Sequence, residues 1–88
     1  MTEQEKIEKA VDEFATAMKE KLFEKANEGF TGWDTMYIRQ LKTMLGEHVI
    51  AQLVYGDEEI DIANYCMFLR YRKMENKAEN EPDEFKGV

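Results

Sequence analysis

Apolar residues return every three or four positions along most of this 88-residue chain. In the first third of the chain, this row consists of Ile7, Val11, Phe14, Met18 and Leu22. Such a spacing gathers apolar side chains on one face of an α-helix, whereas a half-buried strand alternates them. Thr2 and Glu5 form a capping-box pattern before the row, and Gly29 can end the helix after it. We therefore predict a helix over residues 3–27.

A short connector at residues 30–33 precedes a second row at helical spacing, in which the apolar Ile38, Leu41 and Leu45 are followed by the polar His48 and Gln52. Asp34 or Thr35 can cap a second helix there, and we expect this helix to end near Tyr55. The segment 49–54 on its own is compatible with a strand. The helical rows on both sides of it favour a continuous helix instead.

Gly56 and Asp57 form a turn, after which the apolar spacing predicts a third helix over residues 58–75. So short a loop joins helices that run antiparallel, as a helical hairpin. A chain of this length buries too little surface to be a very stable monomer. We therefore expect the all-α, three-helix chain to complete a helical bundle as a homodimer or higher homo-oligomer. Residues 1–76 then form a single helical domain, and the polar residues 77–88 form a disordered tail.

Acidic side chains outnumber basic ones, with 19 Asp and Glu against 12 Lys and Arg and a formal net charge of -7. This charge argues against binding to a nucleic-acid polymer and favours a divalent cation as a ligand. No apolar run approaches the roughly 18 residues of a membrane-spanning helix, and the N-terminal residues lack the pattern of a signal sequence. We therefore expect a cytoplasmic protein without a membrane partner. The single cysteine, Cys66, lies in an apolar helical run, and we interpret it as a packing residue.

Asp61 falls at the centre of the apolar face of the predicted third helix, together with Asn64. Burying an ionised carboxylate without a partner is costly. Asp61 therefore needs a raised pKa, a basic partner or a cation. Once the chain folds back at the turn, the residues of the second helix that can face Asp61 are Glu47, His48 and Ala51.

Two solutions for Asp61 stay open. Glu47, Glu58 and Asp61 would supply oxygen ligands from two helices to Mg²⁺ or Mn²⁺, with His48 as a candidate fourth ligand. Alternatively, His48 is a hydrogen-bonded core residue, or it pairs with Asp61 and relieves the buried charge without a cation. Glu58 also has a purely structural explanation, because the helix dipole stabilises an acid in the first turn.

The stretch 45–49 reads LGEHV, and the stretch 58–69 reads EEIDIANYCMFL. Together they resemble the MazG-like, all-α nucleoside triphosphate pyrophosphohydrolases, especially short phage and archaeal members. That family carries E-E-x-x-E on one helix and E-x-x-D, often leading into D-[VI]-A-N-[FY], on the next. The resemblance implies an all-helical fold that dimerises into a bundle, Mg²⁺ held by acidic side chains, and hydrolysis of a nucleoside triphosphate to a monophosphate and pyrophosphate.

The family's metal motif is only partly present in this chain. Glu58 and Asp61 match E-x-x-D, and Glu47 matches the first glutamate of E-E-x-x-E. His48 and Ala51 stand where the family has its other two glutamates. The resemblance therefore implies metal ligands at the three matching acids, and hydrolysis that is weak or lost because two carboxylates are missing.

Under this hypothesis the nucleotide contacts fall on Asn64, in the matching DIANY run, and on Trp33. Trp33 lies in a glycine-flanked turn, where its ring either stacks on a nucleotide base or closes the end of the core. The competing hypothesis is a noncatalytic interaction or regulatory protein of the viral or phage type. In such a protein, Asp61, Asn64 and His48 form a buried polar network that fixes the register of a dimer.

Overall fold

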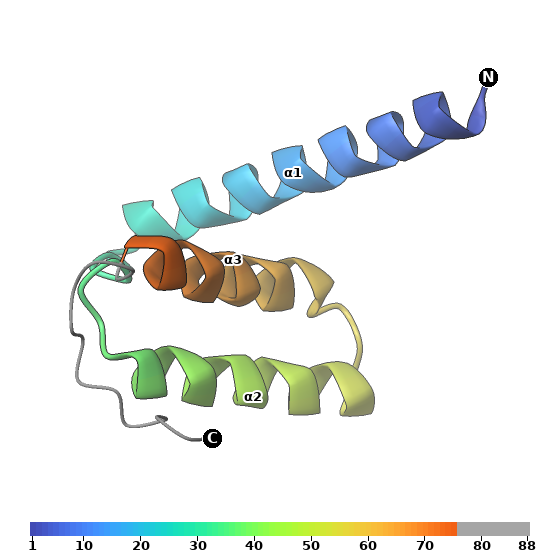
Figure 1. Ribbon diagram of the computed structural model, residues 1–88. Coiled ribbons are helices and arrows are strands. Elements are labelled where there is room, and N and C mark those ends of the chain that lie inside the picture. Colours follow the sequence, from blue (N-terminus) through green and yellow to red (C-terminus); the bar gives the residue numbers. More distant parts are fainter. Residues whose placement is uncertain (76–88) are drawn as a thin grey trace. The chain divides into compact units, whose positions relative to one another are not determined.

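A computed structural model of the chain describes residues 1–75. This part of the chain contains no strand, and its elements are the helices α1 (Glu3–Asn27), α2 (Ile38–Val54) and α3 (Glu59–Glu75) (Figure 1). The prediction of an all-α fold with three helices is confirmed. The polar tail predicted for residues 77–88 lies outside the described residues. None of the described helices is long and apolar enough to cross a membrane.

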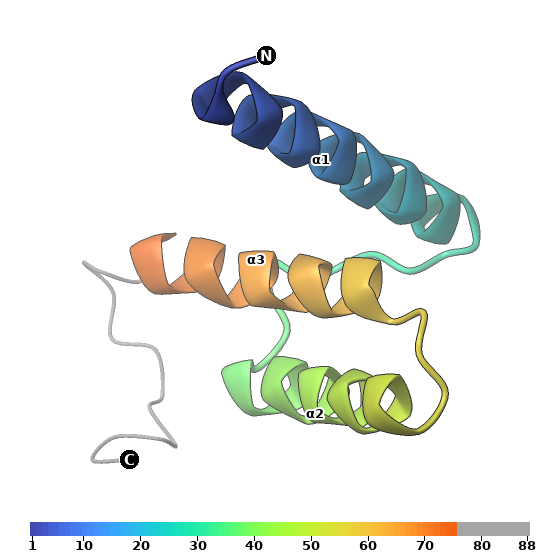
Figure 2. The ribbon, with the colours of Figure 1, turned by 90° about the vertical axis from the view of Figure 1, so that its right-hand side faces the viewer.

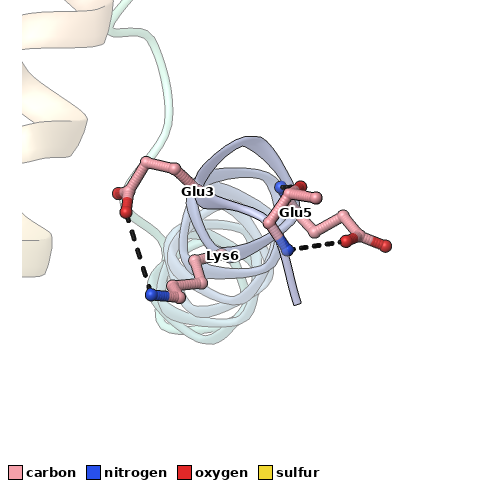
Figure 3. A network of polar contacts seen from close by, with 4 residues as sticks. Glu3, Glu5 and Lys6 are labelled. Atoms are coloured by element: carbon pink, nitrogen blue, oxygen red, sulfur yellow. Dashed lines mark hydrogen bonds and ion pairs between the residues drawn. The ribbon is translucent and has the colours of Figure 1, made fainter.

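The start of α1 is a capping box. The Thr2 hydroxyl accepts a hydrogen bond from the backbone N–H of Glu5 at 3.1 Å. In return, the Glu5 carboxylate accepts one from the backbone N–H of Thr2 at 2.8 Å, and hydrogen bonds from the backbone and the side chain of Thr2 to this carboxylate lower the pKa of Glu5. Glu3 and Lys6 form an ion pair of 3.8 Å in the same turn (Figure 3). The capping box predicted from the sequence is therefore confirmed.

The end of α1 is set by Gly29, as predicted. Gly29 has a φ of 98°, in the left-handed region that favours glycine. The backbone N–H of Phe30 donates to the carbonyl oxygen of Lys25 at 2.9 Å, and that of Gly29 donates to Ala26 at 3.0 Å. These two bonds form a Schellman motif, which satisfies carbonyl groups that the last helical turn would leave without donors.

The chain divides into two compact units, Met1–Thr31 and a second unit that begins at Gly32. In the second unit, α2 and α3 lie side by side and run in opposite directions (Figures 1 and 2). Their contact buries three apolar side chains, which are Leu41, Tyr65 and Phe68. The ring of Trp33 stacks on Phe68 with 4.6 Å between centroids, which agrees with the interpretation that Trp33 closes the end of the core.

The start of α2 differs from the prediction. We expected Asp34 or Thr35 to cap the helix, but α2 is capped by Tyr37, without a side-chain hydrogen bond. Asp34 and Thr35 lie in a turn, in which the backbone N–H and the hydroxyl of Thr35 donate to the Gly32 carbonyl at 3.1 and 3.2 Å. The hydroxyl therefore stabilises the turn and leaves the helix without a side-chain cap.

Arg72 of α3, which is far from residues 33–36 in the sequence, holds this connector in place. Its guanidinium donates hydrogen bonds to the carbonyl oxygens of Trp33, at 3.1 Å, and Met36. Arg72 is buried, so its charge is shielded from water and faces carbonyl dipoles instead. The connector therefore continues to residue 37. The local sequence around Asp34 and Thr35 gives no sign of the contact with Arg72.

The polar residues of α3 divide into a buried and an exposed set. Asp61 is 8% exposed and Asn64 is 2% exposed, so their predicted burial is confirmed. Cys66 is exposed, and its interpretation as a packing residue was wrong. The physical reason is its angular position, about 140° around the helix from Asp61, on the side of the exposed Arg70 and Lys73.

Candidate functional site

Three titratable side chains converge where α2 and α3 meet the turn that joins them. One ligand atom from each of His48, Glu58 and Asp61 lies within 4.8 Å of the other two. The side chains of His48 and Glu58 are 26% and 25% exposed, and Asp61 is buried. The group therefore has a buried side, at Asp61, and a side that water or a small ligand can reach.

The turn places Glu58 at the start of α3. Gly56 and Asp57 both adopt positive φ, at 86° and 66°, which reverses the chain within a short distance. The Glu58 carbonyl accepts the N–H of Ile62 at 2.9 Å, so α3 begins at Glu59, one residue later than predicted. The Glu58 backbone N–H donates to the Oε1 atom of Gln52 at 2.7 Å. Gln52 thereby ties the first turn of α3 to the last turns of α2.

His48 and Glu58 are joined directly. Nδ1 of His48 lies 2.5 Å from Oε1 of Glu58. Because a carboxylate can only accept, the imidazole donates from Nδ1, and in its neutral form Nε2 then carries the lone pair that a metal or a proton can use. The Tyr65 ring stacks on His48 with 5.2 Å between centroids and 27° between planes. These two contacts fix the orientation of the imidazole.

The pKa of Tyr65 is sensitive to the negative charge around the site. Burial raises the pKa of Tyr65, and the negative charges of Asp61 and Glu47 raise it further. Both carboxylates therefore act on the phenol as charges of the same sign as its ionised form. A divalent cation near Asp61 would complement this concentration of negative charge.

The structure brings together three of the four predicted metal ligands, namely His48, Glu58 and Asp61. Glu47 is exposed and is not a member of that group among the described residues. It precedes His48 by one position, and this places the two side chains about 100° apart on the helix. Glu47 therefore acts on the site through its charge, as its effect on Tyr65 indicates.

The two predicted nucleotide contacts occupy different environments. Asn64 is one turn beyond Asp61 on α3 and is buried. Trp33 is half-buried, and Phe68 covers one face of its ring while Tyr71 meets it edge-on at 5.3 Å. Stacking of a nucleotide base on Trp33 is thus restricted to the part of the ring that these two neighbours leave exposed.

Sequence reasoning missed two residues that support the site, Gln52 and Tyr65. The signal for Gln52 was its place four residues after His48, on the same helical row. The signal for Tyr65 was its place four residues after Asp61 on α3. Neither spacing reveals the actual contacts, which run between helices: Gln52 to the Glu58 backbone, and Tyr65 to the His48 ring.

The donor set fits a divalent cation. Carboxylates suit Mg²⁺ and Mn²⁺, and an imidazole shifts the preference toward Mn²⁺ and other transition metals. In an octahedral shell with bonds of about 2.1 Å, opposite ligands are about 4.2 Å apart. The spread of 4.8 Å is slightly larger, so small side-chain rotations would bring the three groups onto one ion.

Comparison of the chain with protein-family models, with curated proteins and with solved structures gives no match. The geometry of His48, Glu58 and Asp61 is therefore the basis for a functional proposal. These residues present two carboxylates and one imidazole, with access to water on one side. Such a group can bind a cation, exchange protons, or hold two helices together.

Proposed function

We propose that this chain binds a divalent cation, Mn²⁺ in preference to Mg²⁺, at His48, Glu58 and Asp61. The observation that carries the proposal is the convergence of these three side chains around a buried carboxylate. A cation at this place would offset the cost of burying Asp61. The exposed side of the group leaves room for coordinated water or for a ligand that approaches the ion.

We further propose a nucleoside triphosphate as the ligand of the bound cation. Support comes from the chemistry of the ion, because Mg²⁺ and Mn²⁺ sites with few protein ligands complete their coordination with water and phosphate oxygens. It also comes from the resemblance of Glu58 and Asp61 to the E-x-x-D motif of the MazG-like pyrophosphohydrolases. In the proposed reaction, water attacks the α-phosphorus, the bond from that phosphorus to the α,β-bridging oxygen breaks, and pyrophosphate leaves.

The proposed activity is weak or absent, with nucleotide binding retained. His48 and Ala51 stand at two positions where the resembled family has glutamates, and Ala51 offers no ligand atom. Fewer carboxylates hold the cation less tightly and leave less charge to orient an attacking water. Binding requires fewer of these interactions than catalysis does.

Thermal unfolding with and without Mn²⁺ or Mg²⁺ tests the cation site. A cation present at 100 times its dissociation constant stabilises the native state by about 2.7 kcal/mol, and Mn²⁺ is expected to act at lower concentrations than Mg²⁺. Asp61→Asn and His48→Gln should abolish this gain. Glu59→Gln is the matched control, because it removes the same charge as Glu58→Gln from the adjacent, exposed position.

Two outcomes would contradict the cation site. One is a wild-type protein whose unfolding temperature does not respond to millimolar Mn²⁺ or Mg²⁺. The other is an equal loss of the response in Glu58→Gln and Glu59→Gln, which would assign the effect to general screening of negative charge. Release of pyrophosphate from a nucleoside triphosphate, measured for wild type and Glu58→Gln, tests hydrolysis separately from binding.

A second candidate is a noncatalytic helical module in which His48, Glu58, Asp61 and Asn64 form a structural polar network. The short His48–Glu58 hydrogen bond favours it, because this bond satisfies both groups without a cation. Under this hypothesis, His48→Gln destabilises the hairpin while the wild type shows no response to Mn²⁺. The two candidates therefore predict opposite results in the same unfolding experiment.

A further inference from the structure

Glu58 is the N-cap of α3, the residue directly before the helix. Its carbonyl oxygen accepts the backbone N–H of Ile62 at 2.9 Å, which is the first hydrogen bond of the helix. Counted from this N-cap, Asp61 is the third residue of α3. The two acids therefore have the spacing of a capping box, in which the side chain of the third residue accepts a hydrogen bond from the backbone N–H of the N-cap.

The start of α1 shows how a capping box looks in this same chain. Thr2 is the N-cap there, and its backbone N–H donates to the carboxylate of Glu5, the third residue of that helix, at 2.8 Å. At the start of α3 the corresponding N–H belongs to Glu58, and it donates to Oε1 of Gln52 at 2.7 Å. Gln52 belongs to α2, so a side chain of the neighbouring helix accepts the hydrogen bond that a capping box would give to Asp61.

This arrangement directs both acids at the start of α3 toward the site. The Glu58 carboxylate bonds Nδ1 of His48 at 2.5 Å, and a ligand atom of Asp61 lies within 4.8 Å of both groups. If Asp61 accepted the Glu58 N–H instead, its carboxylate would lie against the N-terminus of α3, where the helix dipole favours a negative charge. The Gln52 amide is uncharged, so it accepts the N–H without adding a third carboxylate beside the other two.

We propose that Gln52 is a positioning residue of the cation site: by accepting the Glu58 N–H, it keeps the Asp61 carboxylate directed toward His48 and Glu58. This role rests on the proposed cation site, because its first consequence is a higher affinity for the ion. Its second consequence needs no ion. When the Gln52 oxygen is removed, Asp61 takes over the Glu58 N–H and turns away from the site.

Titration of the full chain with Mn²⁺, followed by the electron paramagnetic resonance signal of the free ion, tests the effect on affinity. Gln52→Met has a side chain of similar length without an oxygen acceptor, and it should raise the dissociation constant for Mn²⁺ at least about 10-fold. Gln52→Glu keeps the acceptor and should bind Mn²⁺ at least as tightly as the wild type. Gln40→Met is the matched control, because it makes the same substitution at an exposed position of α2. Circular dichroism of each variant checks that helix content is retained.

Hydrogen exchange of the Glu58 amide, measured by NMR in the presence of a chelator, tests the hydrogen bond itself. Asp61→Asn should leave the exchange rate nearly unchanged, because Gln52 accepts this N–H in both proteins. Gln52→Met should raise the rate only slightly, because Asp61 replaces the lost acceptor. The double variant, Gln52→Met with Asp61→Asn, should raise the rate at least about 10-fold above that of the wild type.

Four results would overturn the proposal. Faster exchange of the Glu58 amide in Asp61→Asn alone would show that Asp61 already caps α3, and this measurement needs no variant of Gln52. Equal Mn²⁺ affinity of the wild type and Gln52→Met would remove the positioning role and leave the cation site standing. Equally weak binding by Gln52→Met and Gln52→Glu would assign the loss to packing at this position. A wild type that binds no Mn²⁺ would overturn the cation site itself, and this role with it.

Discussion

Nδ1 of His48 lies 2.5 Å from Oε1 of Glu58, and this hydrogen bond joins α2 to the first turn of α3. Both side chains are about three-quarters buried, so water screens the interaction less than it screens a surface ion pair. The same two residues are also ligand candidates in the proposed cation site, and that proposal gives the site two states. In one state the imidazole and the carboxylate satisfy each other, and in the other an ion lies between them.

The first prediction concerns this hydrogen bond in the absence of a cation. His48→Gln and Glu58→Gln should each lower the free energy of unfolding by about 1–2 kcal/mol, because a hydrogen bond to a charged group is lost in a partly buried place. Urea unfolding in the presence of a chelator measures the effect. A double-mutant cycle should give a coupling energy of about 1 kcal/mol. Zero coupling would show that the two residues act independently.

The second prediction concerns Asp61. The change in the free energy of unfolding caused by Asp61→Asn should have opposite signs without and with the cation. Without a cation, Asp61→Asn should raise the free energy of unfolding by about 1 kcal/mol, because it removes a buried charge that lies beside Glu58. With saturating Mn²⁺, the wild type should become the more stable protein. Unfolding curves of both proteins, with and without Mn²⁺, measure the crossover. If Asp61→Asn is less stable in both conditions, its carboxylate has a structural role instead.

The third prediction concerns the pH dependence of stability. Burial and the charges of Asp61 and Glu47 raise the pKa of Tyr65 above its ordinary value of 10.0. Between the unfolded and the folded pKa, the native state retains a proton that the unfolded state has lost. The contribution of Tyr65 to stability is therefore complete below about pH 10 and is lost as the pH rises through the folded pKa.

Tyr65→Phe has no proton to lose, so its stability should fall less steeply than that of the wild type over this alkaline range. Urea unfolding between about pH 8 and pH 11 measures the difference in slope. Tyr55→Phe is the control, because Tyr55 is exposed and should leave the slope unchanged. Parallel curves for wild type and Tyr65→Phe would contradict the raised pKa.

The fourth prediction concerns Arg72 and the connector before α2. Arg72→Ala should lower the free energy of unfolding by about 2–4 kcal/mol, because it leaves the carbonyl groups of Trp33 and Met36 without their charged donor. The fluorescence of Trp33, the single tryptophan, follows the unfolding directly. Arg70→Ala is the control, since Arg70 is exposed on the same helix. Equal effects of the two substitutions would rule out a specific role for the buried guanidinium.

The sequence predicts the helices well where their signals are local. The ends of α1 follow from Thr2, Glu5 and Gly29, and each of these acts within a few residues of its own position. The burial of Asp61 and Asn64 also follows from local information, because helical geometry alone places them on the apolar face of α3. Periodicity is sufficient for such features.

The sequence fails where a residue acts on a distant part of the chain. The sequence offers Asp34 and Thr35 as caps, but both lie in a turn, and Arg72 donates hydrogen bonds to the carbonyl groups of Trp33 and Met36 on either side of them, so α2 begins only after residue 37. The position of Glu47 depends on the same kind of distant contact, because the structure groups His48, and not Glu47, with Glu58 and Asp61. Helical periodicity gives the angle between two neighbouring residues, but only the packing of α2 on α3 decides which of them faces Asp61.

The turn at Gly56 and Asp57 keeps the residues of the site close together in the sequence. His48, Gln52, Glu58 and Asp61 all belong to one short, continuous segment of the chain, because the turn folds α2 and α3 back immediately. Contacts between residues so close in sequence form quickly and cost little chain entropy. Residues 48–65 therefore contain every side chain that the site uses, including the Tyr65 ring on His48, so we expect this one segment to carry the site into another helical hairpin with the same reversal.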